Sequence, residues 1–313
     1  MAGLRTRGMV LGLLGMALTG TGCNETTSSM NGSLTLQLTD APFPFDSVAR
    51  VDIFVVRIDG KLAATDSSDA ATAADPGANT DPGKGFVTLA TPNARYNLLA
   101  LQQGTTANLG QATLPTGAYQ GFRLILNTDS SSVTLKNGSV LKGNTTPGIK
   151  WPSAGQSGIK IVLDQPINVV ASGSVMVLDF DLGRSFVLRG RTISQNGLLF
   201  TPVIKAVARD ITGSVSGSVR SDSAKGTIAA NATVELLKAG STLNDTVTAD
   251  VIRSGKSDST GAFKLSFILP GTYALRATPS TTMAASYNPA LQASVTVTSG
   301  ADAGGNLLVL PHK

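Results

Sequence analysis

Apolar and polar residues alternate in the stretch that follows residue 31. Leu34, Leu36 and Leu38 fall on one side of an extended chain, and the residues between them are polar. Residues 39–42 (TDAP) end this predicted strand, because Asp and Pro favour turns. A second run, rich in Val and Ile, covers residues 48–58. Both patterns indicate β-strands that bury one face.

Further strands are predicted where branched and aromatic residues recur between turns rich in Gly, Asn and Pro. They cover residues 86–89, 120–126, 159–163, 175–180 and 198–207. Pro202 cannot donate a ladder hydrogen bond, so it marks the last run as an edge strand or a bulge. One short helix is expected at residues 96–102. Residues 63–85 lack apolar periodicity and are expected to form a disordered inserted loop.

The second half of the chain carries seven shorter strand patterns, at residues 211–219, 232–237, 246–253, 261–267, 272–277, 291–297 and 306–310. Such regular spacing is typical of a sandwich. A turn is predicted at Pro270-Gly271, with Phe263, Leu265, Phe267, Tyr273 and Leu275 pointing into the core. The prediction is an all-β chain with two β-sandwich-like domains in tandem, residues 32–210 and 211–313.

The first 23 residues have the architecture of a signal peptide. Arg5 and Arg7 precede an apolar run over residues 9–18, and small residues lead to Cys23, the one cysteine of the chain. The apolar run has about half of the roughly 20 residues that a membrane-spanning helix needs. We therefore predict a signal peptide over residues 1–22 that is removed by cleavage. An ordinary secretory signal with an incidental cysteine is the alternative.

The residues before Cys23 resemble the bacterial lipobox, which implies lipid attachment at the Cys23 thiol. Gly20 departs from the pattern, because Leu is usual there. More than one acyl chain on one residue implies stable membrane anchoring, since a single chain gives marginal binding. Asn24 is not the Asp that resembles an inner-membrane retention signal, so outer-membrane or cell-surface display is expected. Residues 23–31 are predicted to be a flexible tether from the lipidated cysteine.

Composition excludes several classes of function. Loss of Arg5 and Arg7 with the signal peptide lowers the net charge from +5 to +3, and the remaining basic residues are scattered, so no nucleic-acid partner is expected. One Cys and one His exclude an intramolecular disulfide and zinc sites of the Cys/His kind. No cofactor is predicted.

Six segments, in chain order, resemble the bacterial domain-of-unknown-function family 4382. They are GSLTLQLTDAP, VARVDIFVVRIDG, NLLALQQGTTANLGQATLPTGAYQGFRLIL, WPSAGQSGIKIVL, VLDFDLGRS and FTPVIKAV, within about residues 32–209. The stretch SDSTGAFKLSFILPGTYALRA resembles the carboxypeptidase regulatory-like, transthyretin-like domain. The first resemblance implies a fold and an envelope location, and the second a support module. Neither implies an activity.

Paired carboxylates are the first candidate chemistry. Asp179 and Asp181 are two apart on a predicted strand, so their side chains share a face about 7 Å apart and could hold Ca²⁺ or a sugar hydroxyl. Salt bridges or turn capping with nearby Arg184, Arg189 or Arg191 are the structural alternative. Asp40 ends the first strand, where Asp commonly caps its own turn.

Trp151, the one Trp of the chain, could stack on a sugar ring or fill the core, and core or rim packing is favoured. No catalytic constellation is found. We predict a lipid-anchored envelope protein with a non-enzymatic binding or structural role, whose partner beyond the membrane is a polysaccharide or another envelope protein. The alternatives are a carbohydrate-binding surface module, and a hydrolase or Ca²⁺-binding protein that uses the Asp carboxylates.

Overall fold

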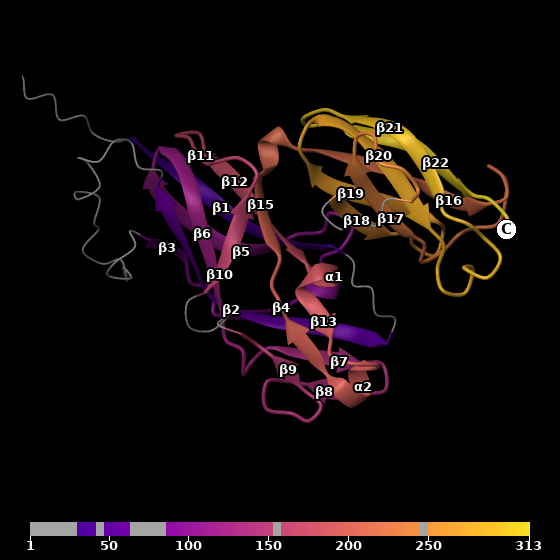
Figure 1. Cartoon of the computed structure of the whole chain (residues 1–313). Helices are drawn as coiled ribbons and strands as arrows, with labels where there is room; N and C mark the ends of the chain where they lie inside the picture. Colours follow the sequence, from indigo (N-terminus) through magenta and orange to yellow (C-terminus); the bar gives the residue numbers. More distant parts are fainter. Residues whose placement is uncertain (1–29, 42–46, 63–85, 153–157, 245–249) are drawn as a thin grey trace, which may run out of the picture.

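The structure is a computed structural model that describes residues 30–41, 47–62, 86–152, 158–244 and 250–313 (Figure 1). It is all-β, as predicted, and the described helices are single turns. They are the 3-10 turns η1 (Leu98–Ala100) and η2 (Arg209–Ile211) and the α-helical turns α1 (Leu182–Ser185) and α2 (Ile193–Asn196). Within the described residues, no helix is long and apolar enough to cross a bilayer.

A twelve-stranded mixed sheet forms most of the first domain. Its strands are β1 (Asn31–Ala41), β2 (Val48–Leu62), β3 (Val87–Ala90), β4 (Ala94–Asn97), β5 (Ala107–Pro115), β6 (Gly117–Leu126), β7 (Ser132–Leu135), β8 (Val140–Leu141), β10 (Ile159–Leu163), β11 (Ile167–Val169), β12 (Ser174–Asp181) and β15 (Ile204–Ala208). The main path runs β5-β1-β12-β15-β10-β6-β2-β7-β8, with β11 on β6 and with β3 and β4 on β2. A small second sheet has the order β13 (Phe186–Leu188), β14 (Leu198–Phe200), β9 (Ile149–Lys150).

The predicted alternation explains how β1 contributes to the core. Leu34, Leu36 and Leu38 are fully buried, while the residues between them are partly exposed. β1 pairs antiparallel with β5 and parallel with β12, so its register partners are 69 to 84 residues away in β5 and 140 residues away in β12. The parallel pair matters for the site, because it brings the carboxyl ends of β1 and β12 together.

The second domain is a sandwich of two sheets around its own core. One sheet has the order β19 (Ala262–Ile268), β16 (Gly213–Ser221), β22 (Asp302–Leu310), and the other β18 (Val251–Lys256), β17 (Thr233–Lys238), β20 (Gly271–Thr278), β21 (Ala290–Val297). Six of the seven predicted strands are present. Of the strand predicted at residues 246–253, residues 246–249 lie outside the described part of the chain, and β18 begins at Val251. Phe263, Leu265 and Leu275 are buried in the core as expected, and Tyr273 packs against it.

Some predictions for individual segments were wrong. The short helix expected at residues 96–102 is the end of β4 followed by the single turn η1. The run 198–207 is two strands, β14 and β15, separated by residues 201–203, where Pro202 interrupts the ladder. Phe267 does not join the sandwich core, because its φ of +60° breaks the alternation of β19. The loop predicted at residues 63–85 lies outside the described residues.

Candidate functional site

Asp40, Asp179 and Asp181 lie at the carboxyl ends of two neighbouring strands of the first domain, with Asp40 on one face of the sheet and Asp179 and Asp181 on the other. In the parallel β1–β12 pair, Asp40 is opposite Phe180, Thr39 is opposite Asp179, and Ala41 is opposite Asp181. Asp179 and Asp181 therefore follow the i, i+2 spacing that the sequence predicts. The approach of Asp40 was not predicted, because nothing in the sequence shows that strands 140 residues apart pair.

Each of these carboxylates has a different environment. Asp40 is 5% exposed, and its Oδ1 accepts a 3.3 Å hydrogen bond from the Leu182 amide, whereas its buried Oδ2 has no hydrogen-bond partner among the described residues. The turn that Asp40 was expected to cap falls on residues 42–46, which the structure does not describe. Asp181 accepts a 3.0 Å hydrogen bond from the Arg184 amide and caps α1, which is one of the structural roles considered for it.

Burial controls how these carboxyl groups titrate. Desolvation raises the pKa of Asp40 well above its usual value, and the nearby charges of Asp179 and Asp181 raise it further. Burial likewise raises the pKa of Asp181, with Asp179 adding to the effect. Burial also raises the pKa of Asp179, although the positive charges of Arg253 and Lys205 oppose the shift. Burial and mutual repulsion therefore disfavour three charged carboxylates together at this edge.

Arg253 of the second domain provides the counter-charge. Its Nη1 forms an ion pair with Asp179 Oδ2, and its Nη2 donates a 3.2 Å hydrogen bond to the Phe267 carbonyl oxygen. The two ionic side chains are only 9% and 10% exposed, so the pair is buried between the domains. None of the arginines considered from the sequence is this partner. Arg253 lies within a predicted strand, but finding its role requires knowing how the two domains dock.

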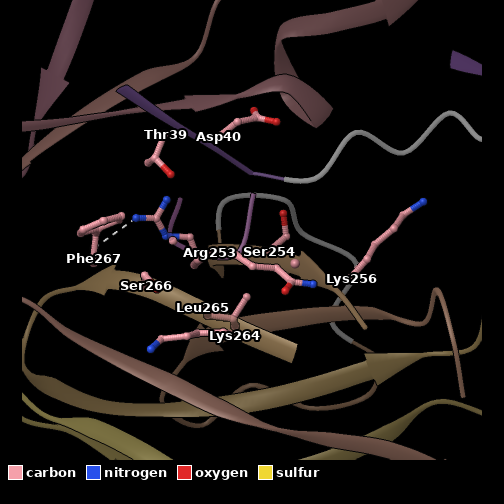
Figure 2. A pocket seen from close by; sticks show the side chains of 12 residues that line it. Thr39, Asp40, Arg253, Ser254, Lys256, Lys264, Leu265, Ser266 and Phe267 are labelled. Carbon is pink, nitrogen blue, oxygen red and sulfur yellow. Dashed lines mark hydrogen bonds between the residues drawn. The ribbon is translucent and has the colours of Figure 1, made fainter. Parts of the chain in front are cut away.

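A small cavity lies beside this ion pair, and Figure 2 shows its walls. Thr39 and Asp40 approach from β1, while Arg253 reaches from β18 toward Phe267 of β19, and Lys256 points the other way. The cavity has a volume of about 20 Å³, which is the size of a single water molecule. It is therefore too small for an organic ligand.

A larger groove adjoins the cavity at the same domain junction, with a volume of about 420 Å³. Gln103 and Gly104 border it from the first domain, where both adopt positive φ. Gly104 is needed there, because an added Cβ would overlap Ser266 Oγ. Lys264 and Phe267 border the groove from the second domain, so both domains contribute to its walls.

Three charged side chains lie along the groove: Arg209, Lys264 and Asp302. Asp302 accepts hydrogen bonds from Ser214 Oγ at 2.7 Å and Ser216 Oγ at 2.5 Å. Partial burial opposes ionisation of Asp302, but the Ser216 and Ser214 hydroxyls and the charge of Lys264 lower its pKa overall. The groove is thus polar, with charges of both signs.

The geometry gives little support to a metal centre. Within the described ranges, no group of three or more His, Cys, Asp or Glu side chains is arranged to hold a metal ion. Asp179 faces a guanidinium group, and Asp181 is occupied by a helix cap. The Ca²⁺ hypothesis for the paired carboxylates is therefore not carried further.

A family model described as a domain of unknown function (DUF4382) matches residues 31–202, more than half of the chain. The chain belongs to the DUF4382 family. The match includes all three aspartates at the edge and ends before Arg253, so the ion pair joins the DUF4382 domain to a segment outside it.

The DUF4382 domain continues beyond the matched residues. β15 begins at Ile204 and completes the sheet by pairing with β10 and β12. No curated protein matches the chain at a significant level.

Pilins are among the solved structures that match. The minor pilin of Streptococcus agalactiae shares 14% identity, with 89% of this chain and 96% of that chain covered and a TM-score of 0.25. The shaft pilin of Lactobacillus rhamnosus GG shares 10% identity, with 90% and 98% covered and a TM-score of 0.26. At scores this low, the likeness carries no argument about function.

Trp151 has a packing role in the DUF4382 domain. Its ring centroid lies 4.6 Å from that of Phe200 and 5.9 Å from that of Phe186, and the side chain packs against the main core. It borders neither the cavity nor the groove. Cys23 lies outside the described residues.

Proposed function

We propose that this protein is lipid-anchored in the cell envelope through Cys23 and has a non-enzymatic binding or structural role at the outer membrane or cell surface. The signal-peptide architecture and the position of the sole cysteine support the anchor. The described part of the chain begins at Met30, seven residues after Cys23, and β1 follows directly.

The observation that carries a binding role is the groove at the domain junction. The buried Arg253–Asp179 pair fixes the second domain against the DUF4382 domain, and the groove takes walls from both. A hydrolase that uses Asp179 and Asp181 as acid and base is disfavoured, because Asp179 is covered by Arg253 and Asp181 caps α1. The second domain then serves as the support module that its transthyretin-like resemblance implies.

Carbohydrate is the second candidate for the binding role. Gln103, Arg209, Lys264 and Asp302 place donors and acceptors along the groove, and such groups suit sugar hydroxyls. In the carbohydrate hypothesis, the groove therefore replaces Trp151 as the expected sugar contact, because Trp151 packs against the core.

Metabolic labelling with a fatty acid tests the anchor. The native chain should take up label, and Cys23→Ser should lose it, since the thiol is the acceptor. Retained label in Cys23→Ser would refute anchoring at this residue.

Binding to a glycan array tests the groove. We expect Lys264→Ala to reduce a glycan signal at least about tenfold, the effect of losing one charged hydrogen bond. Lys160→Ala, an exposed lysine on β10, should leave it unchanged. A native protein with no signal, or equal loss in both variants, would dispose of the carbohydrate candidate.

A further inference from the structure

Three exposed apolar side chains mark the end of the first domain where β1 begins. They are Met30, Leu62 and Val170, which are 68%, 38% and 45% exposed. We call this group the apolar end. A folded protein normally has scattered single apolar residues on its surface, so a group gains meaning only if its members are neighbours.

Thr116 and Gly117 connect Met30 with Leu62. The Met30 carbonyl oxygen accepts a 2.8 Å hydrogen bond from the Thr116 amide. Gly117 is the next residue, and an added Cβ on it would lie 3.4 Å from Leu62 Cδ1. The start of β1 and the end of β2 therefore lie beside the same short segment between β5 and β6.

The same segment leads to Val170. Gly117 is the register partner of Val169, the last residue of β11, and Val170 follows directly. Val170 also borders β1, because an added Cβ on Gly32 would overlap the Val170 carbonyl oxygen. The three side chains thus come from segments in mutual contact.

We propose that the apolar end rests on the lipid bilayer, with Met30, Leu62 and Val170 in the interfacial region. This proposal rests on the lipid anchor proposed above. Cys23 precedes Met30 by seven residues, and a fully extended chain spans at most about 25 Å over that length. An acylated Cys23 would therefore keep Met30, and with it the apolar end, within about 25 Å of the membrane.

Membrane contact fits the chemistry of the apolar end better than a protein partner does. Apolar side chains at the interface are stabilised by burial among headgroups and acyl chains, and the exposed Lys61 beside Leu62 suits anionic headgroups. A stable dimer needs about 800 Å² of surface from each partner, which three side chains do not supply.

Site-specific fluorescence tests the proposal in the full, acylated chain. Acylation consumes the one native thiol, so Val170→Cys can be labelled selectively with the environment-sensitive fluorophore NBD. The control is Val187→Cys in β13, which has a similar exposure of 47% and lies at the opposite end of the domain (Figure 1). Both proteins are reconstituted into phosphatidylethanolamine–phosphatidylglycerol vesicles that contain nitroxide-labelled lipid.

We expect a blue shift and at least twofold stronger nitroxide quenching at position 170 than at position 187. Equal quenching at the two positions in an acylated protein would overturn the membrane contact and leave the anchor standing. A blue shift that depends on protein concentration and not on lipid would show a second copy there and would also overturn it. Absence of acyl label overturns both proposals.

Discussion

At the scale of a residue, Asp40 is a carboxyl group buried at the edge of the first domain. Its Oδ1 accepts a hydrogen bond from the Leu182 amide, and the side chain is almost fully buried. A buried acid with a raised pKa binds its proton more tightly in the folded state than in the unfolded state. Its contribution to stability is therefore complete below the unfolded pKa and is lost as pH rises through the folded pKa.

Replacing Asp40 by Asn should remove this loss of stability at higher pH. Asn cannot ionise and keeps an oxygen that can accept from the Leu182 amide. Above the folded pKa of Asp40, we expect Asp40→Asn to be more stable than the native protein by about 1 kcal/mol or more, and the gain should vanish in acid. Urea unfolding at a series of pH values measures this, with Asp129→Asn, an exposed aspartate, as the control. A gain that does not change with pH would contradict the burial argument.

At the scale of elements, the pairing of β16 with β22 requires the two backbones to approach closely at Gly217. Gly217 lies where the β16–β22 register shifts, and an added Cβ would overlap the Asn306 carbonyl oxygen of β22. The neighbouring backbones leave no room for relaxation, in contrast to a contact with the tip of a side chain.

Gly217→Ala should therefore destabilise the second domain by about 1–3 kcal/mol. Gly304→Ala is the matched control in β22, because its nearest neighbours are the ends of the Asp302 and Ser216 side chains, at 3.3 and 3.4 Å. Thermal unfolding of the two variants compares them directly. Equal midpoints would show that β22 shifts to accommodate the methyl group.

At the scale of elements, the sequence predicts strands and spacings that depend only on neighbouring residues. The alternation of apolar and polar residues predicted β1 and the strands of the sandwich, because a strand with one buried face has a period of two. It missed β5, within which Gly110 adopts a positive φ, and it missed the short strands β4, β7, β8, β9, β11 and β13. The candidate site likewise has a part that the sequence predicts and a part that it does not. The Asp179–Asp181 spacing is local and was predicted, whereas Asp40 and Arg253 arrive through the β1–β12 pairing and the domain contact.

At the scale of the whole molecule, one buried ion pair couples two separate cores. Each domain has its own hydrophobic cluster, and Arg253 and Asp179 join them. Removing one partner of a buried pair leaves an uncompensated charge, whereas replacing both by apolar residues of similar size is often tolerated.

We expect Arg253→Ala to lower the free energy of unfolding by about 3–5 kcal/mol. Calorimetry should then resolve two transitions in place of one, since the domains lose their coupling. The double variant Asp179→Leu with Arg253→Met should recover much of the stability. A loss below about 0.5 kcal/mol in Arg253→Ala, the range of ordinary surface substitutions, would show that the pair does not couple the domains.

The parallel pairing of β16 with β22 also has a mechanical consequence. These are the first and last strands of the second domain, and their parallel pairs run from Ser214–Asp302 to Ser221–Leu310, with one register shift between Val215 and Gly217. If the first domain is tethered and the C-terminal end is pulled, the force draws the two strands past each other along their length. Their hydrogen bonds are then loaded together in shear and cannot open one at a time, so this pairing should resist such a pull.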